Sequence, residues 1–253
     1  MWKHTVSKDW MMARTKYLTA SGIKNILPVT ETGRKRSKDQ IEANMMKVFA
    51  HMQTMYISDD DCVSTGAAAR GHMLEPIAIE EANLGLYHWD DIIITKGLLG
   101  WSPDAMSIPQ AGDARLVRGL YSIDILDAPC PADIGEVKSY GIEKHVAAVY
   151  TDKLKCPERW QLAVGMALLR QCQYAHLIFF NPDAQVRIAV KTYSREDLES
   201  EIEMVLEAEE AFREFVEKLP DYHRMNDCIC MNGSEKNSDY YMNKFMKENR
   251  MNV

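Results

Sequence analysis

The chain has 253 residues, and 46% of them are hydrophobic, which suffices for a full apolar core and excludes a disordered or fibrous protein. Its net charge of −7 argues against a protein that coats DNA through a broadly basic surface, although a local basic path is compatible with that charge. No run of 18 or more apolar residues occurs and the first residues lead into no signal-peptide segment, so we expect a soluble intracellular protein without a membrane partner.

The first predicted helix covers residues 19–27. Thr19 or Ser21 can cap its start through a side-chain oxygen, and Pro28 is expected to end it. A serine beside the free N–H groups of a helix start is also suited to hold a phosphate. The basic loop at 32–38 follows, and its four cations are equally compatible with plain solvation and with contact to a DNA backbone.

Two amphipathic helices are predicted next, over 39–56 and 66–84, because apolar residues recur there at helical spacing. Pro76 is expected to kink the second helix or to begin its second half. The stripe of the first helix, which we expect in the core, comprises Ile41, Met45, Val48, Phe49 and Met52. The expected buried face of the second helix comprises Leu74, Ile77, Ala78 and Ala82.

The middle of the chain is predicted to consist of strands and turns. A β-branched run at 92–95 indicates a buried strand, and Asp104 falls at its end or in the turn that follows, on an exposed rim. The connection at 105–132 contains two plausible strand pieces, 106–109 and 120–126, separated by turn residues.

A carboxylate and an ammonium group are brought side by side by the alternating stretch at 133–138. On a strand, Glu136 and Lys138 point to the same face while Val137 points into the core. If strand pairing brings Asp104 close to Glu136, the two carboxylates and nearby backbone carbonyls form an oxygen-rich site suited to Mg²⁺ or Mn²⁺.

The C-terminal half is predicted to alternate helices and strands. The expected elements are helices at 140–150, 158–170 and 194–219, the last capped by Ser194, and strands at 174–180 and 185–193. We therefore expect one α/β domain over residues 1–220, with helices on both sides of a central mixed sheet. Weak periodicity at 221–253 indicates a polar tail, in which Cys228 and Cys230 are best read as free thiols.

The pattern Pro103-Asp104 … Glu136-Val137-Lys138 resembles the PD-(D/E)XK nuclease superfamily. Further residues resemble its lambda-exonuclease-like branch, the phage-type viral recombinase nucleases. They are the seven-residue spacing from Arg14 to Ser21, the stretch from Gly71 to Pro76 with Glu75, and Gln161 in the helix that begins near 158. The resemblance covers roughly residues 14–190 and implies a restriction-endonuclease-like fold.

The resemblance also implies roles for the residues of the central pattern. Asp104, Glu136 and the carbonyl of Val137 would hold Mg²⁺, with Mn²⁺ as an alternative, and Glu75 would reach the metal from behind. Lys138 would orient or deprotonate the attacking water, and burial next to the metal is expected to lower its pKa.

The remaining matches concern support of the lysine and recognition of a DNA end. By the resemblance, Gln161 would support the catalytic lysine and water, while Arg14 and Ser21 would hold a terminal 5′ phosphate. The chain departs from the pattern at Ala105, where the family has glycine, and in its longer connection to the second half. Asp124 or Asp133 is therefore kept as an alternative acidic ligand.

The function implied is a Mg²⁺-dependent 5′-to-3′ exonuclease that hydrolyses linear double-stranded DNA in phage-type DNA recombination. It would act in the cytoplasm of a bacterial host as a homo-oligomer, a trimeric ring around the duplex, with a single-strand annealing protein as partner. The alternatives are a structure- or site-specific endonuclease and a DNA-end-binding protein whose nuclease site has decayed.

Overall fold

The computed structural model describes residues 3–30, 33–54, 56–107, 120–122, 131–151 and 158–219. The chain divides into two compact units, residues 1–212 and 213–253, and the sheets and the site described below belong to the first. The tail expected at 221–253, Asp124 and most of the connection at 105–132 lie outside the described residues. Within the described part of the chain, no helix is both long and apolar enough to span a bilayer.

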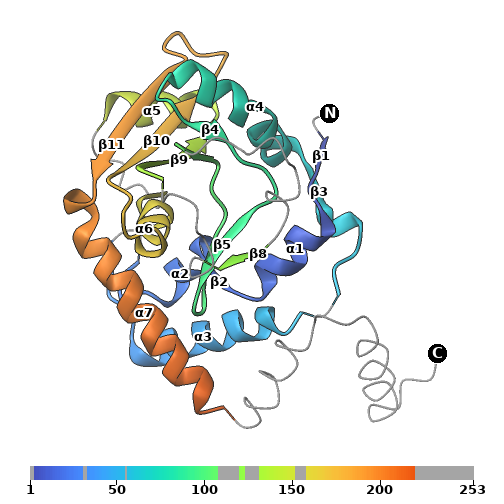
Figure 1. Ribbon diagram of the computed structural model, residues 1–253, viewed down its shortest axis with the longest axis vertical. Coiled ribbons are helices and arrows are strands. Elements are labelled where there is room, and N and C mark those ends of the chain that lie inside the picture. Colours follow the sequence, from blue (N-terminus) through green and yellow to red (C-terminus); the bar gives the residue numbers. More distant parts are fainter. Residues whose placement is uncertain are drawn as a thin grey trace. The chain divides into compact units, whose positions relative to one another are not determined.

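A five-stranded mixed sheet forms the centre of the first unit (Figure 1). Its strands, in spatial order, are β11 (Ile188–Ser194), β10 (Tyr174–Phe180), β9 (Asp133–Lys138), β7 (Ala105–Met106) and β4 (Tyr87–His88). Only β9 and β10 pair in parallel, and the other neighbours are antiparallel. The α/β architecture with a central mixed sheet, expected from the sequence, is thereby confirmed.

Two smaller sheets accompany the central one. A four-stranded sheet has the order β2 (Leu18–Thr19), β6 (Leu99–Trp101), β5 (Ile93–Lys96) and β8 (Leu120–Ser122), and β1 (Lys3–Thr5) pairs with β3 (Val63–Thr65). The β5–β6 hairpin reverses at Gly97, whose φ is 57°. The sequence had suggested that Asp104 follows the strand at 92–95, which is β5. In the structure it follows β6 instead, and lies where the chain passes from the four-stranded sheet to the central sheet.

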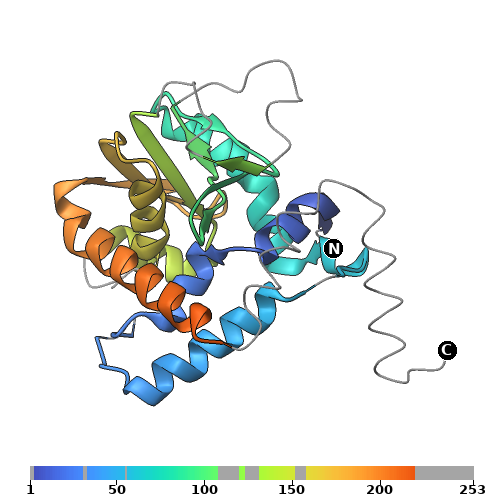
Figure 2. The same cartoon turned by 60° about the horizontal axis from the view of Figure 1, so that its bottom comes forward.

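Seven α-helices are described, and two of them begin with a side-chain cap from serine. Their bounds are α1 (Lys8–Thr15), α2 (Ala20–Ile26), α3 (Lys38–Met52), α4 (Gly66–Ala82), α5 (Ile142–Tyr150), α6 (Glu158–Leu168) and α7 (Glu199–Glu217). Ser7 caps α1, Ser37 forms a capping box with Gln40 on α3, and Asn83 ends α4 with a left-handed φ of 51°. Figure 2 shows α2 between α3 and α6.

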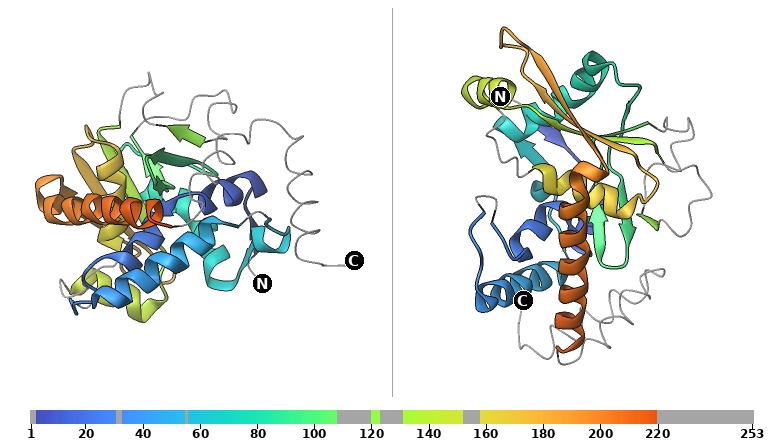
Figure 3. Two further views of the ribbon diagram at one scale, coloured as in Figure 1. Left: turned by 90° about the horizontal axis from the view of Figure 1, so that it is seen from below. Right: turned by 90° about the vertical axis from the view of Figure 1, so that its left-hand side faces the viewer.

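Helices α4 and α6 cover opposite faces of the central sheet (Figure 3). On one face, Leu74 of α4 packs with Val137 and Phe180. On the other face, α6 approaches β9 so closely that a Cβ on Gly165 would lie 2.8 Å from the side chain of Ile134. Because strand side chains alternate, Val137 faces α4 and the residues on either side of it face α6.

Several boundaries and buried faces differ from the predictions. Helix α4 continues through Pro76, and Ile77, which was expected to be buried, is 43% exposed. Only Met45 of the apolar stripe on α3 is buried. Ser194 and Asp197 accept hydrogen bonds from each other's backbone N–H groups, as the predicted cap at Ser194 requires, but the first turn is a 3₁₀ helix (Glu196–Leu198) and the α-helix begins only at Glu199. Helical periodicity identifies the apolar face of a helix, but it does not tell how much of that face other elements cover.

Candidate active site

The site begins where β7 and β9 diverge. Their ladder pairs Met106 with Ile134 and Ala105 with Gly135, and it ends there. A Cβ on Gly135 would lie 2.9 Å from a side-chain atom of Leu86, so this glycine permits the close approach. Beyond the last pair, the backbone N–H of Val137 donates to the Asp104 carboxylate at 2.8 Å. The side chain of Asp104 thus occupies the space that a longer β7 would fill.

Glu136 and Lys138 lie on the face of β9 that is turned toward α6, as their alternation predicted. Glu136 is only 3% exposed, and the ammonium of Lys138 donates a hydrogen bond to its carboxylate. Burial lowers the pKa of Lys138, but the charges of Glu136 and Asp104 outweigh burial and raise it. Two carboxylates thus face the same ammonium, and the expected lowering of the pKa of Lys138 beside a bound metal stays a prediction.

The carboxylates of this site are crowded. Burial raises the pKa of Asp104 well above its ordinary value, and the charges of Glu136 and Glu75 raise it further. Burial also raises the pKa of Glu136, although Lys138 opposes this effect. Buried carboxylates that repel one another are a donor set that fits a small divalent cation, because the cation supplies the missing positive charge.

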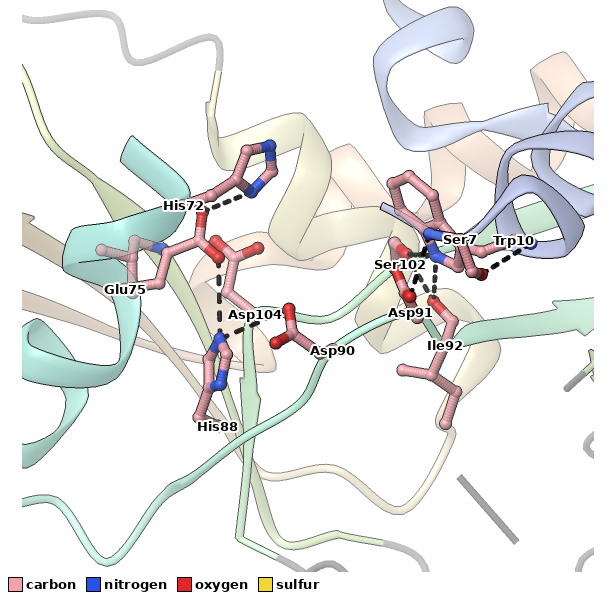
Figure 4. A network of polar contacts seen from close by, with 11 residues as sticks. Ser7, Trp10, His72, Glu75, His88, Asp90, Asp91, Ile92, Ser102 and Asp104 are labelled. Atoms are coloured by element: carbon pink, nitrogen blue, oxygen red, sulfur yellow. Dashed lines mark hydrogen bonds and ion pairs between the residues drawn. The ribbon is translucent and has the colours of Figure 1, made fainter. Parts of the chain in front are cut away.

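Glu75 on α4 is held by two imidazoles (Figure 4). Its Oε1 lies 3.2 Å from Nδ1 of His72, and its Oε2 lies 3.7 Å from Nε2 of His88. Burial alone would raise the pKa of Glu75, but the two histidines lower it to about 2. His72 thereby orients this carboxylate, and its ring stacks on that of His4 with centroids 4.8 Å apart.

Arg14 is fixed beside the site by Trp10. The guanidinium lies 4.4 Å from the centre of the Trp10 ring, and Trp10 Nε1–H donates to the carbonyl of Ile92 and to the hydroxyl of Ser102, two residues before Asp104 (Figure 4). Burial lowers the pKa of Arg14, whereas the charges of Glu136 and Asp104 oppose this effect. The structure therefore brings Arg14 within electrostatic reach of both carboxylates.

Two other predicted site residues, Ser21 and Gln161, make fewer described contacts with Asp104, Glu136 and Lys138. Ser21 lies in the first turn of α2, exposed, with its hydroxyl 3.1 Å from that of Thr19. Thr19 is the N-cap residue, but its side chain makes no capping bond, so the expected side-chain cap is absent. Gln161 lies half-buried on α6, and among the described residues no hydrogen bond joins it to Lys138.

Asp133 is not brought together with these residues. It opens β9 three positions before Glu136 and therefore points to the opposite face of the strand. The register therefore disfavours the alternative in which Asp133 is an acidic ligand of this site.

Sequence reasoning missed a further buried carboxylate, which lies on α6. Glu158 in the first turn of α6 is 7% exposed, accepts a hydrogen bond from the hydroxyl of Tyr140 and lies 3.9 Å from Nζ of Lys144. Its charge raises the pKa of both Glu136 and Lys138. The available signal was its position one helical turn before Gln161, which places both side chains on the same helix face.

Comparisons with known proteins identify the fold. No protein-family model matches the chain, and no curated protein matches its sequence. The structure is similar to that of an alkaline exonuclease, LHK-Exo, from Laribacter hongkongensis, with a TM-score of 0.54 and 18% identity over 84% of this chain and 97% of that one. The same exonuclease in complex with dAMP matches with a TM-score of 0.57 and 17% identity over 88% and 100% of the two chains. The chain therefore has a nuclease fold.

Proposed function

We propose that the protein is a metal-dependent exonuclease that hydrolyses linear double-stranded DNA from the 5′ end. The observation that carries the proposal is the meeting of Asp104, Glu136 and Lys138 at the divergence of β7 and β9. The likeness to an exonuclease that has been solved with dAMP supports DNA as the substrate class. Linear duplex should be degraded in Mg²⁺ while covalently closed circular duplex stays intact, and cutting of the circle would indicate an endonuclease instead.

The carboxylates of Asp104 and Glu136 and the carbonyl of Val137 would hold Mg²⁺ or Mn²⁺, and Glu75 would close the site from α4. A divalent cation supplies an activated water and stabilises negative charge on the scissile phosphate. Lys138 would orient or deprotonate the attacking water, and Gln161 would support it from α6. The hydrogen bond from Val137 N–H holds the Asp104 carboxylate toward Glu136 before any ligand binds.

Arg14 and Ser21 would hold the terminal 5′ phosphate. A guanidinium can grip a phosphate through two parallel hydrogen bonds, and the stacking on Trp10 restricts the orientations of Arg14. Duplex with 5′-phosphate ends should be digested about ten- to a hundredfold faster than duplex with 5′-hydroxyl ends, which corresponds to charge-assisted bonds of roughly 1.5–3 kcal/mol. Digestion rates of the two substrates measure this ratio.

Arg14→Ala should erase most of the preference for 5′ phosphate while leaving residual hydrolysis. Trp10→Phe is the matched variant, because it keeps an aromatic ring under the guanidinium but loses both hydrogen bonds of the indole N–H. It should weaken the preference less than Arg14→Ala does. Equal wild-type rates on both kinds of end would rule out the phosphate site.

We expect the charge of Glu158 to affect the pH dependence of hydrolysis through the pKa of Lys138. Glu158→Gln removes a negative charge that raises the pKa of Lys138, so the rising limb of the pH–rate profile should move to lower pH. Tyr140→Phe is the control, since it removes the hydrogen bond to Glu158 and keeps the charge. An unchanged profile in Glu158→Gln would show that this carboxylate has no electrostatic influence on the reaction.

A basic pocket of about 310 Å³ offers a contact for the DNA backbone. Its lining residues are Thr30, Arg34, Lys35, Arg36, Gln40, Ala43, Asn44 and Lys47. Arg36 has a structural role, because its guanidinium donates to the carbonyls of Leu27 and Val29. The double variant Lys35→Ser/Lys47→Ser should reduce the slope of log binding constant against log salt by about 2, at roughly 0.9 per phosphate contact. The uncharged change Asn44→Ala should leave the slope unaltered, and an unaltered slope in the lysine variant would contradict the contact.

The acidic chain would retain DNA most readily as a homotrimeric ring with its basic segments facing the duplex. Within this proposal, a single-strand annealing protein would receive the strand exposed by digestion. Sedimentation at working concentration distinguishes the ring from a monomer. A result of monomer alone would contradict the ring but not the proposed chemistry.

A further inference from the structure

Beside Asp104 lies a mixed carboxylate–imidazole cluster that the chemistry proposed above does not use as a unit. Glu75, His88 and Asp90 each direct one ligand atom into it, and these three atoms lie within 4.8 Å of one another. Glu75 comes from α4, His88 from the end of β4, and Asp90 from two residues further along the chain. Figure 4 shows the three side chains pointing toward one another.

The backbone of this segment is fixed by the site itself. Trp89 N–H donates to the carbonyl of Asp104 at 3.0 Å, which extends the pairing of β4 with β7 by one residue. Because side chains alternate along an extended segment, His88 and Asp90 point to the same side of it. Nε2 of His88 lies 3.7 Å from Oε2 of Glu75 and 3.8 Å from Oδ1 of Asp90, and the imidazole thus stands between the two carboxylates.

Two of the three donors are held in place and the third is adjustable. His72 holds the other oxygen of Glu75 at 3.2 Å, and the side chains of Glu75 and His88 are 14% and 22% exposed. The side chain of Asp90 is 61% exposed and can move with little loss of packing. Donors about 2.0–2.2 Å from a common ion lie roughly 3.0–3.5 Å apart, so modest inward movement, chiefly of Asp90, completes a coordination shell.

The donor chemistry distinguishes this cluster from the oxygen-rich pair Asp104 and Glu136. An imidazole nitrogen favours Mn²⁺ or Zn²⁺ over Mg²⁺, which prefers oxygen ligands and retains its waters. We propose that Glu75, His88 and Asp90 form a second cation site, selective for Mn²⁺ or Zn²⁺. The site borders the first through Glu75, whose charge reaches Asp104, and solvent access through Asp90 permits exchange of the ion.

Pulsed electron paramagnetic resonance of bound Mn²⁺ tests the site directly, because an imidazole ligand gives a ¹⁴N coupling that oxygen ligands do not give. The full chain is titrated with Mn²⁺ in the absence of DNA, and then with excess Mg²⁺. We expect about two bound Mn²⁺ per chain, of which one shows ¹⁴N coupling and resists displacement by Mg²⁺. His88→Ala should remove the coupled ion, and Asp90→Asn should weaken its binding about tenfold.

His51→Ala, which changes an exposed histidine of α3, is the matched control and should retain both ions. Absence of ¹⁴N coupling in the wild type, or its persistence in His88→Ala, would overturn the proposal. The readout needs no hydrolysis, so loss of the second site and failure of the proposed nuclease function are separate outcomes.

Discussion

Asp104→Asn is expected to lower DNA hydrolysis by about 10³-fold or more, and Glu136→Gln should have a similar effect. Each change removes one of the charges that would hold the divalent cation, whose stabilisation of the transition state amounts to several kcal/mol, at about 1.4 kcal/mol per factor of ten. Asparagine can still accept the hydrogen bond from Val137 N–H, so the local geometry should persist. Initial rates on linear duplex in saturating Mg²⁺ measure the loss, and rates near wild type in either variant would remove the site assignment.

The same substitution should stabilise the metal-free protein. The pKa of Asp104 is raised in the folded state by burial and by the neighbouring carboxylates, so the folded chain binds this proton more tightly than the unfolded chain does. Stability from this group is therefore full below the ordinary pKa near 3.8 and is lost as the pH rises through the raised pKa. Asp104→Asn lacks this loss, and its advantage in Tm over wild type, measured in chelator, should widen with pH across that window.

An exposed carboxylate provides the control for this stability effect. Asp59 is 93% exposed and pairs only loosely with Lys8 at 3.3 Å, so Asp59→Asn should change neither Tm nor hydrolysis appreciably. A lower Tm for Asp104→Asn than for wild type at neutral pH would contradict the crowding of carboxylates, even if hydrolysis is lost.

Lys138→Met is expected to lower hydrolysis by about 10²-fold or more, in the range that general acid–base groups contribute. In contrast to the aspartate variant, it should also destabilise the metal-free protein. Glu136 would be left as a buried charge without its ammonium partner, and breaking such a buried pair costs roughly 3–5 kcal/mol. Urea denaturation in chelator measures the change in the free energy of unfolding.

The double variant Glu136→Gln/Lys138→Met separates the two effects of the lysine. It removes both charges, so most of the lost stability should return while hydrolysis stays absent. If Lys138→Met alone kept wild-type stability, the ion pair with Glu136 would contribute nothing to folding. If it kept wild-type rates, Lys138 would have no part in the chemistry.

Local patterns sufficed to predict the core of the site. The alternation at 133–138 placed Glu136 and Lys138 on one face, and Asp104 was expected at a strand boundary, although that boundary follows β6 and not the strand at 92–95. Both features depend on period and turn chemistry within a few residues, which a sequence displays directly. The central mixed sheet follows from the same strands, and its presence is confirmed by the structure and by the fold comparison.

Contacts between distant segments were not predictable in this way. Trp10 bonds the carbonyl of Ile92, 82 positions away, and Glu158 influences Lys138 from another element. His88 of β4 contacts Glu75 of α4, and a turn of the chain separates these two elements. The two carboxylates that raise the pKa of Lys138 belong to the same class, because burial can be inferred from a pattern while the number of facing carboxylates cannot.

We propose that the residues where β7 and β9 diverge form a metal-dependent site that removes nucleotides from the 5′ ends of duplex DNA. Linear duplex labelled at one 5′ phosphate, incubated with wild type or Asp104→Asn in Mg²⁺ or in chelator, tests it most directly. We predict prompt release of the label as a short 5′ product by wild type in Mg²⁺ only. Release by Asp104→Asn at the wild-type rate, release in chelator, or loss of a 3′ label before the 5′ label would contradict the account.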